Sequence, residues 1–305
     1  MKKVAFCAAA AAMCGSLLAV ESANVVGYTT VTIPAQQYTM IGVQFDGLDG
    51  AGISIQDLFK DPLGQGLVGV GTPGSAAYSD RLMFWDPSET ALGKYVTLYL
   101  NNNATQTARY NKWCTGTTLP VDTSWGTTKN AASTKRLTSG MALWLVRSTY
   151  DQPLTLTMSG QVVVAPEGRS YTCREGYNMI AGGFTTGFAP NPDVAGIGEA
   201  IDWLGKGFIG AGTPGSAVYA DRIMFWDPTE TALGKYITLY LNNNTAQAAR
   251  YNKWCTGTTL PVDTSWGTTK NAASPKVIPA GRGFWLVRPS GAGELTFTLP
   301  QPYTL

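Results

Sequence analysis

The chain contains one long stretch twice, and this repeat limits the possible folds more than any other feature. Residues 72–147 and 213–288 align at a constant offset of 141 positions without a gap, and they differ at 16 of 76 positions. A unit of this length can bury a hydrophobic core of its own, unlike the short units of solenoid proteins, which depend on their neighbours. The sequence therefore predicts two tandem modules made by duplication.

The start of the chain predicts export. Met1, Lys2 and Lys3 form a short basic region, an apolar and alanine-rich run follows over residues 4–20, and small residues stand at 22 and 23. This is the pattern of a secretory signal peptide, whereas a membrane anchor would need a longer apolar run and a basic flank. We expect residues 1–22 to be a signal peptide, 23–160 the first β module and 161–305 the second, with the mature protein secreted or at the cell surface.

Composition excludes several classes of function. Charged residues make up only 14% of the chain, aromatic residues make up 11%, and histidine is absent. Without histidine, the serine and cysteine nucleophiles lack their usual general base, and the commonest metal ligand is missing. The chain has no run of basic residues, so nucleic acid is not expected as a partner. The sequence favours a protein that is not an enzyme and needs no cofactor or metal.

The repeat reads as β structure. KYVTLYL, residues 94–100, alternates with period two, so Val96, Leu98 and Leu100 should face the core, while Tyr95 and Tyr99 should face the other side. MALWLVR and LTLTMSG are expected to close the module as a hairpin. The predicted fold class is all-β, with two tandem β-sandwich or partly open β-barrel modules that carry short helical turns.

Two segments predict those helical turns. Ser54 is placed to cap a short helix that Pro62 ends. Asp86 should cap a single turn over DPSETALG, with Glu89 completing a capping box and Gly93 ending the turn.

Three cysteines remain after the leader, at 114, 173 and 255. A Cys173–Cys255 bridge is compatible with export, but sequence cannot supply the geometry of a disulfide, so buried free thiols are the favoured interpretation.

Two motifs suggest chemistry that their context argues against. Residues 69–74 and 210–215 match the dinucleotide fingerprint G-x-G-x-x-G, yet a Pro-Gly pair and strand-like sequence follow where a helix is required, so both are interpreted as turns. Six acids could suggest a glycosidase or, slightly better, a calcium site, but their positions fit helix caps and turns. These acids are Asp80, Asp86, Glu89, Asp221, Asp227 and Glu230.

Repeated aromatic residues are the remaining candidate site. If the side of KYVTLYL that carries its tyrosines faces solvent, flat rings beside Asn and Thr could stack on sugars, although packing within the fold is the favoured alternative. The candidate binding residues are Trp85, Tyr95, Tyr99, Trp113, Trp125, Trp226, Tyr236, Tyr240, Trp254 and Trp266.

The chain also resembles a recurrent bacterial secreted β-module. In residues 176–299 the resemblance rests on the opening GYNMIAGGF, the central DRIMFWDP and the closing PAGRGFWLVR. Residues 24–160 match the same pattern with departures. There Thr39 stands where the module usually has Asn. The resemblance implies export and β structure, and it carries no catalytic residue onto this chain.

The leading functional hypothesis is an exported structural or adhesive protein of the cell surface or matrix, which is not an enzyme. A glycan-binding protein with one shallow site per module is the alternative, and a secreted hydrolase is the third. Extracellular polysaccharide and self-association are the partners that these hypotheses imply.

Overall fold

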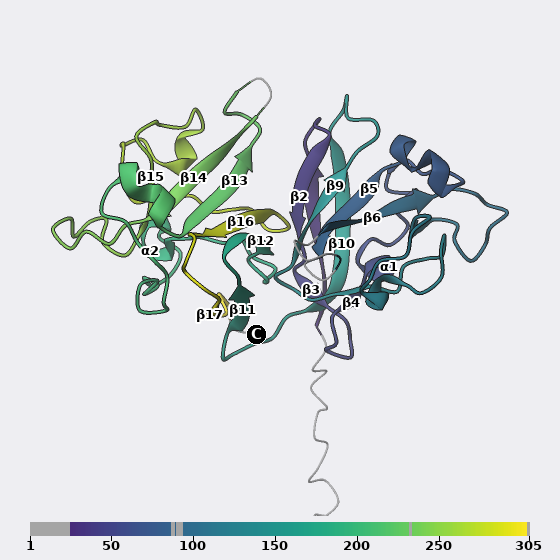
Figure 1. Cartoon of the computed structure of the whole chain (residues 1–305), viewed down its shortest axis with the longest axis horizontal. Helices are drawn as coiled ribbons and strands as arrows, with labels where there is room; N and C mark the ends of the chain where they lie inside the picture. The colour runs from purple at the N-terminus through teal and green to yellow at the C-terminus, as the bar shows by residue number, and fades with distance from the viewer. Residues whose placement is uncertain (1–24, 87–88, 90–93, 232–233, 304–305) are drawn as a thin grey trace, which may run out of the picture.

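The protein forms two lobes that correspond to the two repeats (Figure 1). The computed structural model describes residues 25–86, 89, 94–231 and 234–303. Each lobe is built from antiparallel sheets around its own hydrophobic cluster. The all-β prediction is confirmed, and in the described residues the sheets stack as open layers without closing into a barrel.

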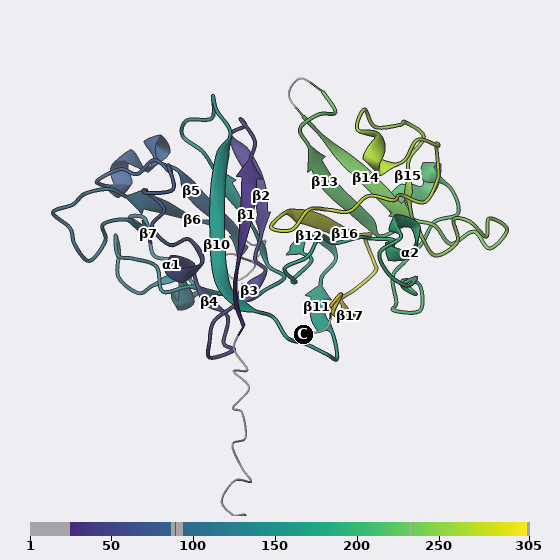
Figure 2. The same ribbon diagram turned by 180° about the vertical axis from the view of Figure 1, so that it is seen from behind.

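Module 1 packs a five-stranded sheet against a three-stranded one. The large sheet has the order β2(Tyr38–Gly42), β9(Ala142–Val146), β5(Arg81–Asp86), β6(Lys94–Asn101), β7(Lys112–Cys114). The smaller sheet has the order β1(Val26–Ile33), β10(Leu154–Val162), β3(Phe45–Asp46), and β4(Ile53–Ser54) pairs with β8(Arg136–Leu137). Seen from behind, β1 and β10 run side by side as the outer layer of this lobe (Figure 2).

Module 2 repeats this arrangement with a reduced second sheet. Its large sheet has the order β12(Gly176–Ala181), β16(Gly283–Arg288), β13(Arg222–Asp227), β14(Lys235–Leu241), β15(Trp254–Thr256). The second sheet is the pair β11(Arg169–Cys173) and β17(Leu295–Leu299), below and between the lobes in Figure 1. Four strands of each large sheet lie within the repeat, and the fifth, β2 or β12, lies outside it but takes the same place at the sheet edge.

The helical segments are short. They are α1(Ile55–Leu58), α2(Pro192–Ala195), and the 3₁₀ turns η1(Pro73–Tyr78), η2(Thr123–Trp125), η3(Pro214–Tyr219) and η4(Thr264–Trp266). Ser54 caps α1 as predicted, because its hydroxyl accepts a hydrogen bond from the Asp57 N–H at 3.1 Å. The turn predicted over residues 86–93 lies mostly outside the described residues. None of these helices has the length and apolarity that crossing a bilayer requires.

The turn that follows β13 departs from the predicted capping box. Asp227 accepts hydrogen bonds from the N–H and the hydroxyl of Thr229, which makes a tight turn rather than a helix. Glu230 accepts from the distant Val262 N–H instead of reaching back to its own turn. The capping box is therefore wrong for this copy, since a loop from elsewhere in the fold supplies the donor.

The predicted closing hairpin is also wrong. β9 pairs with β2 and β5 in the large sheet, whereas β10 pairs with β1 and β3 in the smaller sheet. The chain therefore crosses between layers after β9, and β16 and β17 repeat that crossing. Strand propensity identifies both segments, but the partner of each is decided by which layer still has an open edge.

The alternation predicted for KYVTLYL is confirmed. Leu98 and Leu100 are fully buried, and Val96 and its repeat equivalent Ile237 are each 8% exposed. Tyr99 is buried as well, on the opposite face of β6, where η1 packs against that strand. Both faces of this end of the sheet are therefore covered.

The modules meet through the same surface on each, so their interface has an approximate two-fold axis. Strand pairing makes Gly42 of β2 equivalent to Ala181 of β12. The Gly42 N–H donates to the Gly281 carbonyl, and the Ala181 N–H donates to the equivalent Gly140 carbonyl, each at 2.8 Å. Two antiparallel bridges, between residues 41 and 282 and between 141 and 180, repeat the symmetry. This is the isologous contact of a symmetric dimer within a single chain.

Small residues allow that close approach. A Cβ added to Gly42 would lie 2.5 Å from the Cβ of Ala181, and one added to Gly283 would lie 2.6 Å from the Cβ of Ala142. The equivalent rings of Trp144 and Trp285 meet edge to face, with their centroids 6.4 Å apart. The two modules are thus held as one body by backbone hydrogen bonds and dense packing.

Candidate functional site

Six of the ten predicted aromatic binding residues lie inside the fold. Their side chains are at most 2% exposed, so these six cannot stack on a sugar, and packing within the fold, the favoured alternative, is what the structure shows. These residues are Tyr99, Trp113, Trp125, Tyr240, Trp254 and Trp266.

Each of these buried rings has a structural partner. Trp113 packs edge to face on Phe59 in the core, with ring centroids 6.0 Å apart. The Trp125 Nε1–H donates to Asp86 Oδ2 at 2.7 Å, and Trp266 donates to Asp227 in the same way at 2.9 Å. The duplicated tryptophans therefore hold the loops that follow β7 and β15 onto the sheets.

The other four predicted residues form two edge-to-face pairs. The ring centroids of Trp85 and Tyr95 lie 5.1 Å apart, and those of Trp226 and Tyr236 lie the same distance apart. Trp85 is 42% exposed, but Trp226 donates from Nε1 to Gln36 Oε1 of module 1 at 2.9 Å. The second pair is therefore part of the interface, whereas Trp85 of the first pair is exposed to solvent.

The environment of Tyr236 confirms this difference. Its hydroxyl accepts from Trp285 Nε1 at 3.3 Å. Burial raises its pKa, the hydrogen bond from Trp285 lowers it, and the neighbouring Tyr95 of the other module raises it again. The aromatic faces of the two modules thus look toward one another rather than forming two separate open sites.

The acids proposed for catalysis or calcium hold the backbone instead. Asp80 accepts from the Val68 N–H at 2.9 Å, and its equivalent Asp221 accepts from Ile209 at 2.7 Å. Glu89 accepts from the Val121 N–H, which matches the Glu230 contact in module 2. Among the residues that the structure describes, no three cysteine or acidic side chains gather where they could hold a metal ion.

The glycine motifs and the cysteines behave as the sequence predicts. The G-x-G-x-x-G segments run into the six-residue 3₁₀ turns η1 and η3, which offer no phosphate-binding α-helix. Cys114, Cys173 and Cys255 are free and buried, and burial raises the pKa of each thiol to about 12. Cys173 occupies the place that the buried Ile33 takes in module 1.

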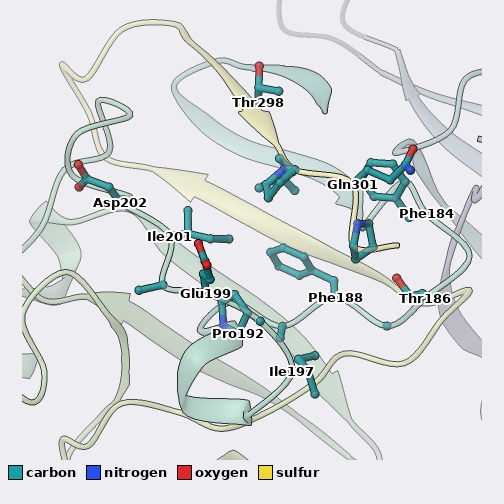
Figure 3. A pocket seen from close by; sticks show the side chains of 18 of the residues that line it. Phe184, Thr186, Phe188, Pro192, Ile197, Glu199, Ile201, Asp202, Thr298 and Gln301 are labelled. Atoms are coloured by element: carbon teal, nitrogen blue, oxygen red, sulfur yellow. The ribbon is translucent and has the colours of Figure 1, made fainter. Parts of the chain in front are cut away.

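A pocket of about 840 Å³ opens on module 2, in the part of the chain where the modules have diverged (Figure 3). Segment 182–189 forms its floor, loop 197–206 forms one wall, and the chain beyond β17 forms the other. Its volume is within the range of about 300–1,000 Å³ that small-molecule sites occupy. Phe188 lies near its centre, with Glu199 and Ile201 on one side and Gln301 beside Phe184 on the other (Figure 3).

Sequence reasoning missed this pocket because it lies outside the repeat. The available signal was the pair Pro300 and Pro302, which follow the last strand where module 1 continues with Ser159, Gly160 and Gln161. Proline has no backbone N–H and interrupts a ladder, so the strand was bound to stop early.

Comparison of the chain with protein-family models, curated proteins and solved structures finds no match.

Proposed function

We propose that this is an exported structural or adhesive protein of the cell surface or extracellular matrix, and that it works as one rigid two-module body without catalysis. The observation that carries the proposal is the two-fold interface, in which equivalent backbone groups of the two modules bond to each other. Domains that need to move are joined by exposed linkers and small polar interfaces. Interlocked modules suit a protein that holds a fixed shape between two attachments.

The use of the carboxylates supports a role without catalysis. A general acid or base needs a side chain that can exchange protons with a substrate. Asp86 and Asp227 accept from buried indole N–H groups, and Asp80 and Asp221 accept from backbone N–H groups. Each of these contacts has its equivalent in the other module, which a single active site would not require.

The proposal is tested by locating the protein and measuring attachment. We expect the mature chain, beginning near residue 23, in the envelope or matrix fraction of its host, and we expect cells without it to attach or cohere less well. Complementation with Gly283→Val, which forces the interface apart, should fail where the matched control Gly74→Ala succeeds. A Cβ at Gly74 meets no atom within 4 Å.

Two results would contradict the proposal. One is an abundant cytoplasmic protein that keeps Met1. The other is a product released from an extracellular polymer by purified protein and lost on changing Asp86 or Asp227.

A further inference from the structure

We propose that the pocket of module 2 is a binding site for a neutral polysaccharide, with the Phe188 ring as the surface on which one sugar residue stacks. The site is distinct from the aromatic residues that the repeat duplicates, and it occurs in one module only. The proposal does not depend on the scaffold role of the interface, since the pocket is formed by module 2 alone.

Comparison with module 1 explains why the ring of Phe188 is uncovered. In module 2, Phe188 forms an antiparallel bridge with Ile278, and in module 1 Ile53 pairs with Leu137, the equivalent of Ile278. Phe188 and Ile53 therefore occupy equivalent places. Ile53 is 3% exposed because β10 passes over it: a Cβ on Gly160 would lie 2.7 Å from its Cδ1. In module 1 this place is therefore part of the core.

Module 2 lacks the covering strand. β10 continues to Val162 and pairs there with Phe45, whereas β17 ends at Leu299, which is equivalent to Met158. The chain then passes through Pro300 and Pro302, which cannot continue a ladder. The missing strand leaves the space above Phe188 open.

A longer loop turns that opening into a pocket. Gln56 and Asn191 occupy equivalent places, since each donates from its side-chain amide to the carbonyl of an equivalent core tryptophan. The distances are 2.9 Å to Trp113 and 2.8 Å to Trp254. Asp61 and Asp202 also match, since each accepts from an equivalent asparagine, at 2.6 and 2.8 Å. In module 1, four residues lie between Gln56 and Asp61. In module 2, ten residues lie between Asn191 and Asp202. The six additional residues in module 2 build a wall of the pocket.

The Phe188 ring is fixed in orientation before a ligand arrives. It stacks on Phe284, with centroids 4.9 Å apart and planes 5° apart, and it meets the edge of Trp203 at 6.5 Å. Phe284 covers one face of the ring, while the half-buried ring still lines the open pocket. A flat ring held in place can receive the apolar C–H face of a sugar with little loss of conformational entropy.

The surrounding groups define the class of ligand. Glu199 offers a carboxylate acceptor to a sugar hydroxyl (Figure 3). Gln301 is held by the Ala165 N–H and the Tyr303 carbonyl, each at 2.6 Å, which leaves its second Nε2–H as a donor. Thr298 already pairs with the Ser170 hydroxyl at 3.0 Å. The charged residues that line the pocket are three acids and one base, namely Glu167, Glu199, Asp202 and Lys206. The pocket therefore disfavours sulfated or uronic polymers and suits neutral ones.

Affinity electrophoresis of the full mature chain tests this proposal. The gels contain xylan, glucomannan or hydroxyethyl cellulose as neutral polymers, alginate as a polyanion, and chitosan as a polycation. We expect retardation by at least one neutral polymer and none by alginate. Phe188→Leu, which keeps an apolar side chain but removes the flat ring, should weaken the apparent affinity about tenfold.

Further variants separate binding from folding. Ile197 lies on the rim of the pocket and is 59% exposed, so Ile197→Trp adds bulk there without disturbing the core and should also weaken retardation. Tyr78→Ala removes a 76% exposed aromatic side chain outside the pocket and should leave retardation unchanged. The proposal is overturned if no neutral polymer retards the wild type, if only chitosan does, or if Phe188→Leu and Ile197→Trp both bind like the wild type.

Discussion

Arg288 donates from Nη1 to Asp221 Oδ2 at 3.1 Å, and both side chains are buried in module 2. The equivalent Asp80 instead accepts from the backbone N–H and the hydroxyl of Ser148, at 2.6 and 3.1 Å. Position 289 is a proline, which offers neither donor, and Asp221 Oδ1 is left without a partner among the described residues. One difference between the modules has thus changed the partners of a buried carboxylate.

This arrangement predicts an unusual pH dependence. Burial raises the pKa of Asp221 from 3.8 to about 6, against the lowering effects of the Ile209 N–H and the charge of Arg288. Because the folded pKa is the higher one, the group contributes stability that is complete below 3.8 and is lost as the pH rises through about 6. The free energy of unfolding of the wild type, measured relative to Asp221→Asn by urea denaturation, should fall between these pH values. A difference that does not change with pH would contradict the prediction.

Exchanging the neighbouring residues should move this effect. Pro289→Ser can return two donors to Asp221, which favours the charged carboxylate and should shift the pH-dependent loss to lower pH. The reciprocal Ser148→Pro removes two donors from buried Asp80 and should lower the free energy of unfolding by about 1–3 kcal/mol. If Pro289→Ser keeps the pH profile of the wild type, or Ser148→Pro keeps its free energy of unfolding in urea, the corresponding hydrogen bonds do not control these carboxylates.

The hydrogen bonds of the buried tryptophans can be weighed by a matched pair of substitutions. Trp125→Phe removes both ring volume and the bond to Asp86, whereas Trp113→Phe removes only volume, because the Trp113 Nε1 is buried without a partner among the described residues. Trp125→Phe should therefore be the more destabilising by about 1–2 kcal/mol in thermal or urea unfolding. Equal losses would mean that the bond to Asp86 adds nothing.

Adding volume to the interface should loosen the two-module body. Gly283→Val must displace Ala142 and Met40, whose side-chain carbons lie 2.6 and 2.8 Å from the position that an added Cβ would take. Overpacking of this kind typically costs about 1–3 kcal/mol. Calorimetry should show a lower melting temperature or two separate transitions, while X-ray scattering should show a larger radius of gyration. Unchanged values in both measurements would show that the interface tolerates the bulk.

The cysteines provide a chemical test of the native fold. All three described thiols are free and buried, and their raised pKa leaves little thiolate at pH 8. A thiol reagent should label none of them in the folded protein prepared without residues 1–22, and all three in denaturant. Fewer labels in denaturant, restored by a reductant, would reveal a disulfide.

The sequence predicts the local elements well because they depend on neighbouring residues. The alternation of Val96, Leu98 and Leu100 follows from strand geometry, and the Ser54 cap needs only residues within one turn. Burial of Tyr99 could not be predicted in the same way. Alternation assigns it to the face opposite the core, but η1, which is remote in sequence, decides whether that face is covered.

The pocket was beyond prediction for a different reason. It depends on a missing strand above Phe188 and on an inserted loop, both recognisable only when the two modules are superposed by their pairing. The prolines at 300 and 302 indicate that a strand ends there, but they do not indicate which residues a longer strand would have covered. Composition and repeat identity emphasise what the modules share, whereas the candidate site lies where they differ.

The two-fold interface also creates a route to domain swapping. Since each module presents the contact surface that the other recognises, two chains whose modules separate can exchange partners and rebuild the same backbone hydrogen bonds between molecules. Only residues 163–168 connect the last strand of module 1 to the first strand of module 2, and this short hinge governs how easily the exchange occurs. Reciprocal exchange would close into a dimer, whereas exchange along successive chains would extend into a fibre held by the contacts of the folded monomer.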